Sequence, residues 1–353
     1  MITERLPAFG PATVAAPRGR RLLGRALARP SLPALVGLVV VVVVFGVQSP
    51  GLLTAGGLAS VLDVAAQFGI GAVAVALLLI AGQFDVSVGV LAVATSLVTA
   101  LLIGSAGWGT WPALLASLAV ALAIGLVNGV LVVNTGLPSI LVTLATFLVL
   151  QGVSQAGPRA VTGSSRVSGL HEAPGWASAN AVFDSTVQLG DGRFRISLVW
   201  FLVVTALATW TLWRTRFGNA VLASGGARQA ARELGVAVRR TTVALFCLSA
   251  TAGWLLGTIA LVRLGGVQVG NPGLSTGIDF IVIAVIGGCL LTGGYGSAIG
   301  AALGALLYAV AQEGIVLAGW DPRWFQTLLG VLLVVALLAN GVVRRRLKAV
   351  PRS

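Results

Sequence analysis

The sequence places four carboxylates inside or beside long apolar stretches, where they could take part in chemistry: Asp63, Asp85, Asp279 and Glu313. A charge at the centre of a bilayer costs at least ~3 kcal/mol, so the expected depth of each carboxylate decides its role. Asp63, Asp279 and Glu313 each fall near one end of an apolar stretch, and the topology argued below places all three at the external rim. These positions favour solute contact or ion pairing over a proton relay at the midplane.

Asp63 and Gln67 are four residues apart and therefore share a helix face. They either line an external vestibule or, as we favour, belong to a structural pairing with Arg263 or Arg323. Further along, Asn128 is a single amide that either faces a solute or bonds between helices.

A later apolar stretch gathers hydroxyl and amide groups on one side. Thr143, Thr146, Gln151 and Ser154 fall within an arc of roughly 140° at helical spacing. In membranes such side chains either contact a polar solute or bond to their own carbonyl four residues earlier. The sequence leaves both interpretations open.

Motifs for catalysis or cofactor binding are missing from the sequence. A G-x-x-x-x-G-K-[ST] loop is absent and Lys348 is the sole lysine, so any nucleotide energy must come from another chain. His171 is the only histidine, and Cys247 and Cys289 fall in apolar stretches typical of small core residues. We therefore expect a protein that is not an enzyme and that binds no metal or cofactor.

The elements that position these residues follow from composition: 57% of the 353 residues are hydrophobic and only 9% are charged. A bilayer core of ~30 Å requires about 20 apolar residues per helix, so recurring apolar runs predict an all-α polytopic membrane protein. We predict ten spans, with an eight-helix version as the main alternative. They cover residues 31–49, 61–82, 86–104, 110–133, 139–157, 197–213, 242–262, 277–291, 298–317 and 324–343.

Basic residues set the expected orientation. Seventeen of the 23 lie in the Arg-rich tail 1–30, in the segment 214–241 or after residue 343, which predicts cytoplasmic termini and excludes a nucleic-acid surface. The N-terminal basic region is too long for a signal peptide, so the first apolar stretch is expected to stay as an anchor. A transmembrane domain over 31–343 then carries an external loop, 158–196, and a cytoplasmic loop, 214–241, before a basic tail, 344–353.

The cytoplasmic loop contains a short helix candidate, Arg228 to Leu234, between Gly225-Gly226 and Gly235. At 28 residues the loop is long enough to favour docking of a partner over a plain connection. Asp85 falls at the junction of two predicted spans, in "FDVS", where we expect it to cap the third span in a tight cytoplasmic hairpin. "LPSILVTL" (137–144) and "DPRWFQTL" (321–328) open two spans on opposite faces, as an inverted repeat requires.

Several stretches together resemble the permease subunit of ABC importers of the ribose-type simple-sugar family. "AGQFDVSVGV" is similar to the family's signature at Asp85, Ser87, Val88 and Gly89, although Ala81 replaces its first glycine. "GLVNGVLVVNTGLPSILVTLATFLVLQG" matches at Asn128, Gly129, Pro138, Thr143 and Thr146. "ASGGARQAARELGV" matches the cytoplasmic loop at Gly225, Gly226, Ala230, Ala231, Arg232 and Gly235, and the late glycine motif matches at Gly287, Gly288, Gly293, Gly294, Gly296, Ser297 and Gly300.

The resemblance implies a pseudo-symmetric, type II-like permease in a bacterial inner membrane. Its partners would be a second permease copy or a paralogue, an extracytoplasmic binding protein that delivers a sugar, and cytoplasmic ATPases that hold ATP and Mg. Residues Arg228–Gly235 would couple to the ATPase, although Arg228 and Gln229 replace acidic residues often found there. Candidates to meet the binding protein would be Arg159, Arg166, Arg263 and Arg323.

Other functions remain open at this stage. The same machinery could import branched-chain amino acids, nucleosides or a signalling sugar derivative. An ion-coupled secondary transporter also uses inverted repeats but usually carries ionisable residues near the midplane. A membrane scaffold that only docks soluble partners is the third alternative.

Overall fold

The structure is a computed structural model that describes residues 31–164, 166–268 and 274–349, so the N-terminal tail lies outside the described residues. All ten predicted apolar stretches form helices within these ranges. Six helices (α3, α5, α6, α8, α11 and α13) are long and apolar enough to cross a membrane, and α2, α4, α12 and α14 contain shorter apolar runs. The helices are α2 (Leu32–Gln48), α3 (Ala55–Ile80), α4 (Val88–Gly104), α5 (Thr110–Thr135), α6 (Ser139–Thr162), α8 (Ser197–Arg214), α11 (Val238–Leu264), α12 (Leu274–Ile286), α13 (Ala298–Leu317) and α14 (Trp324–Ala349).

The helical, membrane-spanning fold class is therefore confirmed, while the number of crossings and the side of each terminus stay predictions. Three helices end elsewhere than expected: α6 runs on to Thr162, α12 stops at Ile286, and α14 continues to Ala349. Hydrophobicity delimits the apolar core of a helix but not its polar ends, which explains the longer α6 and α14. α12 ends because a run of glycines begins at Gly287 and Gly288 has a positive φ of 93°.

The loop predicted over 158–196 contains regular structure, which corrects the purely helical expectation. β1 (Arg166–Ser168) pairs antiparallel with β4 (Gly266–Gln268), and β2 (Thr186–Leu189) forms a hairpin with β3 (Gly192–Arg195). The loop also holds η2 (Leu170–Glu172) and α7 (Trp176–Phe183), and η1 (Pro50–Leu53) precedes α3. The β1–β4 pairing joins residues 100 apart in sequence, a contact that no local pattern predicts.

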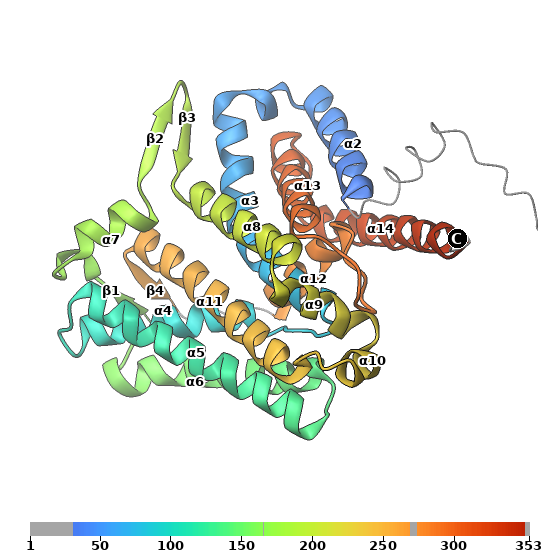
Figure 1. Ribbon diagram of the computed structural model, residues 1–353. Coiled ribbons are helices and arrows are strands. Elements are labelled where there is room, and N and C mark those ends of the chain that lie inside the picture. The colour runs from blue at the N-terminus through green and yellow to red at the C-terminus, as the bar shows by residue number, and fades with distance from the viewer. Residues whose placement is uncertain (1–30, 165, 269–273, 350–353) are drawn as a thin grey trace, which may run out of the picture.

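The core of the bundle is α3, which packs against α13, α8, α12 and α11 (Figure 1). Its residues from Gly69 to Ile80 are all buried. α11 packs most closely against α5 and α4, where Gly125, Gly129 and Gly257 let the backbones approach. Apolar side chains on the outer faces of α2, α5, α6 and α8 stay exposed, as lipid-facing surfaces require.

α3 and α4 do not form the tight hairpin that the sequence suggested around Asp85. Residues 81–87 between them are not helical, and α4 then diverges to pack against α11, α5 and α6 (Figure 1). The hairpin prediction was wrong because apolar pattern alone does not say which helices become neighbours.

The segment 214–241 is more ordered than a loop. Thr215 caps α9 (Arg216–Gly226) by accepting from Gly218 N–H at 3.0 Å, and α10 (Arg228–Glu233) follows after one residue. The short helix was predicted within a residue, whereas Gly225 and Gly226 belong to the end of α9. This segment and the β2–β3 hairpin lie at opposite ends of α8, which begins near Asp63 and ends at α9.

Candidate solute path and coupling surface

An ion cluster closes one end of the bundle. Arg263 of α11 donates to both carboxylate oxygens of Asp63 on α3, at 3.0 and 2.9 Å. It also donates to Asp184 at 3.2 Å, and Arg195 of β3 donates to Asp184 at 2.7 Å. Ser197 and Gln67 add hydrogen bonds to Asp63 at 3.1 and 3.2 Å. The cluster ties α3 and α11 to the segment that holds α7 and the β2–β3 hairpin.

Asp63 therefore forms the structural ion pair with Arg263 that we favoured over a place in an external vestibule. Both of its oxygens are engaged, so a role for Asp63 and Gln67 as free solute ligands does not fit this conformation. Arg263 is engaged in the same way, with a side chain only 17% exposed, so the docking role expected of it does not fit this conformation. Arg159, Arg166 and Arg323 are exposed and remain candidates. Asp184 and Arg195 were missed because nothing in their spacing marks them as partners.

The other two acidic candidates lie on adjacent helices. Asp279 of α12 is 9% exposed and accepts from the Tyr308 hydroxyl of α13 at 3.5 Å. Tyr308 also packs against Phe68, with ring centroids 4.5 Å apart, and against Phe325 at 4.9 Å. Glu313 is half-buried on α13, one residue after Gln312, whose buried side-chain oxygen has no hydrogen-bond partner. This polar and aromatic face stays the best candidate for solute contact.

Asp85 is the centre of a second, buried network. Its carboxylate accepts from Ser87 N–H at 2.9 Å, from the Ser87 hydroxyl at 2.6 Å and from the Ser249 hydroxyl of α11 at 2.8 Å. Ser87, not Asp85, is the N-cap residue of α4, so Asp85 fixes the helix start from two residues upstream. Ser249 was not predicted, because it lies 164 residues away in sequence.

Three of the predicted path residues extend this network. The Asn128 amide donates to Ser87 at 3.3 Å and accepts from the Thr146 hydroxyl at 2.5 Å. Thr143 accepts from Val86 N–H at 3.3 Å and is fully buried. These groups hold segment 84–87 in place, so we do not assign them to solute contact in this conformation. Gln151 is half-buried farther along α6, and its role stays a prediction.

The glycine motifs lie where chain segments approach closely. A Cβ on Gly89 would lie 3.0 Å from Cβ of Thr276 on α12, and one on Gly296 would lie 2.7 Å from Sγ of Cys289. Gly293 and Gly294 lie against the ends of α3 and α9. Close packing thus explains why the resemblance falls on these positions.

The end of the bundle opposite the ion cluster carries the predicted coupling surface. A cavity of about 640 Å³ there is lined by Arg232, Arg239 and Arg240 together with Gly235. Within the described residues no ion pair involves an arginine of this segment. Partial burial, and then the neighbouring Arg232 guanidinium, lower the pKa of Arg228, whose buried Nε has no hydrogen-bond partner. Ala230 and Ala231 complete the helix, with Ala231 packed inward.

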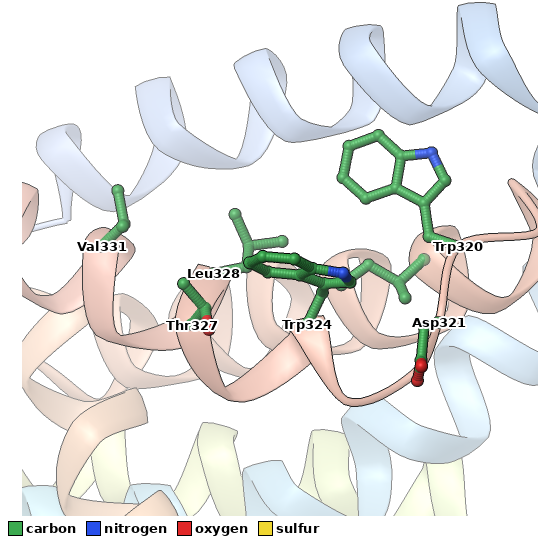
Figure 2. A pocket seen from close by; sticks show the side chains of 7 residues that line it. Trp320, Asp321, Trp324, Thr327, Leu328 and Val331 are labelled. Atoms are coloured by element: carbon green, nitrogen blue, oxygen red, sulfur yellow. The ribbon is translucent and has the colours of Figure 1, made fainter.

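A second cavity, of about 430 Å³, lies where α13 ends and α14 begins (Figure 2). Its walls are the Trp320 and Trp324 indoles and the apolar side chains Leu328 and Val331, and Asp321 points away from the indoles (Figure 2). Tryptophans at helix ends are typical of the membrane–water interface. The cavity therefore fits an interfacial position better than a polar solute.

Together, the apolar helices with polar clusters at both ends define a multi-pass membrane protein. A family model described as "Branched-chain amino acid transport system / permease component" matches residues 57–337. The chain belongs to this family. No solved structure matches it.

Three relatives cover nearly the same length. The chain is 34% identical over 328 residues to the Probable ABC transporter permease protein YphD of Escherichia coli K12, covering 88% of this chain and 90% of that protein. It is 29% identical over 323 residues to the Fructose import permease protein FrcC of Rhizobium meliloti, with 89% and 87% covered. It is 29% identical over 311 residues to the Ribose import permease protein RbsC of Escherichia coli K12, with 87% and 92% covered.

The ion cluster predicts strong coupling between Asp63 and Arg263. Asp63→Asn and Arg263→Gln should each destabilise the detergent-solubilised protein, and the double variant should lose less than the sum. We expect a coupling energy of about 0.5 to 3 kcal/mol from thermal unfolding. Arg323→Gln, whose side chain is 93% exposed, is the matched control and should leave stability unchanged. Additive losses at Asp63 and Arg263 would contradict the pairing.

The Asp85 network predicts a graded response to substitution. Asp85→Ala leaves Ser87 N–H and two hydroxyls without their acceptor, and each buried unsatisfied group costs about 1–3 kcal/mol. Asp85→Asn keeps a carbonyl acceptor and should cost less. We expect the unfolding temperature to fall from wild type to Asp85→Asn and further to Asp85→Ala. Equal stability of wild type and Asp85→Ala would show that the network does not hold the non-helical residues 81–87 in place.

Proposed function

We propose that this chain is the permease subunit of an ATP-binding cassette importer for a simple sugar. The observation that carries the proposal is the similarity, over nearly the whole chain, to permeases named for fructose and ribose import. A galactose/methyl galactoside import permease of Escherichia coli is also similar, at 28% identity over 65% of this chain. The family description names branched-chain amino acids instead, and they are the second candidate cargo.

The arrangement of the bundle supports alternating access driven from one end. Asp63 and Ile80 lie on one helix, roughly 25 Å apart at 1.5 Å per residue. The ion cluster thus marks one face and α9–α10 the other. In the proposal, the cluster lies on the external face, where a binding protein delivers solute near Arg159, Arg166 and Arg323. Solute then passes the face formed by Asp279, Tyr308 and Glu313.

Energy is supplied by partners in this proposal. Cytoplasmic ATPases hold ATP and Mg, and α10 docks in a groove of the ATPase. Because Arg228 and Arg232 lack carboxylate partners among the described residues, we infer that this groove is acidic. ATP-driven closure shifts α9–α10 and biases the bundle between outward-facing and inward-facing states. A second permease copy or a paralogue completes the assembly.

The test is uptake in proteoliposomes that contain the permease with its ATPase, with the binding protein added outside. ATP inside the vesicles should drive uptake of a labelled sugar from a panel of ribose, fructose and galactose. Labelled leucine, presented in the same vesicles with the same binding protein, is the comparison cargo. Uptake of leucine alone would move the assignment to branched-chain amino acids, and uptake driven by an ion gradient without ATP would refute the importer.

Replacing Arg228–Gly235 with a flexible Gly-Ser segment of equal length should abolish ATP-dependent uptake, because the rigid docking helix is lost. The protein should still fold, since only Ala231 of α10 is buried. Gel filtration in detergent measures folding, and co-purification of the ATPase measures docking. The expected result is a folded permease without bound ATPase, and normal uptake by this variant would disprove the coupling role of α10.

A further inference from the structure

Glycines from three distant segments meet at one point on the coupling side of the bundle. Gly82 follows α3, Gly225 lies in the last turn of α9, and Gly293 and Gly294 lie in the turn that precedes α13. We call this contact the glycine junction. All three segments were recognised separately in the sequence, as the signature around Asp85, the cytoplasmic loop and the late glycine motif, but nothing there indicated that they touch.

The junction joins backbone to backbone. Gly294 N–H donates to the carbonyl oxygen of Ile80 at 2.8 Å, which links the turn to the last residue of α3. A Cβ on Gly225 would overlap that same carbonyl oxygen and would lie 2.5 Å from Gly294 N. A Cβ on Gly293 would lie 2.9 Å from both Gly225 O and Gly82 N. Any side chain at these positions would force the three segments apart.

Backbone conformation adds a second constraint at the turn. Gly293 and Gly294 have φ values of 79° and 75°, in the left-handed region that other residues adopt only with strain. The turn is therefore fixed both by its own dihedral angles and by the close approach of its neighbours.

Contacts of this kind transmit displacement efficiently. Side chains can change rotamer and absorb a movement, whereas interlocked backbones must move together. α10 follows α9 after Ala227 alone, and α13 begins four residues after Gly294. Ile80 directly precedes segment 81–87, which Asp85 anchors to α11. Any movement of α9–α10 would therefore reach α3, α13 and the Asp85 segment at one place.

We propose that the glycine junction carries the movement of the docked helices α9 and α10 into the solute path, with Gly82, Gly225, Gly293 and Gly294 as positioning residues of the transport cycle. This proposal rests on the proposed function as an ATP-driven importer. It adds that coupling inside the permease depends on backbone contact at these glycines, separately from docking of the ATPase on α10.

The adjacent glycines of α9 provide a matched pair for the test. Gly225→Ala inserts a methyl group into the junction, whereas the nearest neighbour of a Cβ on Gly226 lies 4.0 Å away, at Gly294 Cα. In the reconstituted complex, Gly225→Ala should keep its ATPase and hydrolyse ATP but lose roughly tenfold in uptake. Gly226→Ala should match wild type in both measurements. Normal uptake by Gly225→Ala, or an equal loss in both variants, would overturn the proposal.

A second measurement covers the case in which Gly225→Ala does not fold. Spin labels are placed on Asn219 of α9 and on Leu291, both exposed, in a Cys247→Ala, Cys289→Ala background, and on Asn219 and Leu137 as the comparison pair. Between nucleotide-free and ATP-trapped complexes, the distance across the junction should stay constant while the comparison distance changes. A change across the junction, or no change in either pair, would overturn the proposal. Wild-type uptake in the same preparation tests the importer itself, so the two failures are distinguishable.

Discussion

The structure depends on hydrogen-bond partners for one stretch of non-helical backbone inside an apolar bundle. Residues 81–87 are not helical, and a bundle in lipid has no water to pair with freed N–H and C=O groups. Side chains supply the partners: Ser139 accepts from Phe84 N–H at 2.8 Å, Thr143 accepts from Val86 N–H, and Asp85 accepts from Ser87 N–H. α6 and α11 are thereby fixed relative to the start of α4.

This constraint also explains why polar residues accumulate around one small region. Asn128 and Thr146 extend the network from its side chains: Asn128 donates to the Ser87 hydroxyl and accepts from Thr146. An incomplete network would be costly in a low-dielectric interior, so its members depend on one another. Residues that look like a polar lining in the sequence stabilise a bend in this conformation, and the acidic and aromatic face of α12 and α13 stays the candidate for solute contact.

The sequence was informative wherever the signal is local. Apolar runs marked the ten longest helices of the described residues, and the glycines around Arg228 marked α10, because length and hydrophobicity are properties of contiguous residues. Contacts between residues far apart in sequence could not be predicted. Ser249 as partner of Asp85, and Asp184 as partner of Arg263, follow only from which helices become neighbours. The Asp63–Arg263 pair was an exception, since the predicted topology already placed both at one rim.

The ion cluster has a consequence for the solutions in which the protein can work. Salt screens exposed pairs such as Arg323–Asp321, whose side chains are 93% and 51% exposed, much more than partly buried ones. Arg263 and Asp184 are only 17% and 13% exposed, and their contacts lie between chain segments rather than in open solvent. The end of the bundle that carries them should therefore keep its shape from dilute to concentrated salt, without relying on the ionic strength of the medium that bathes it.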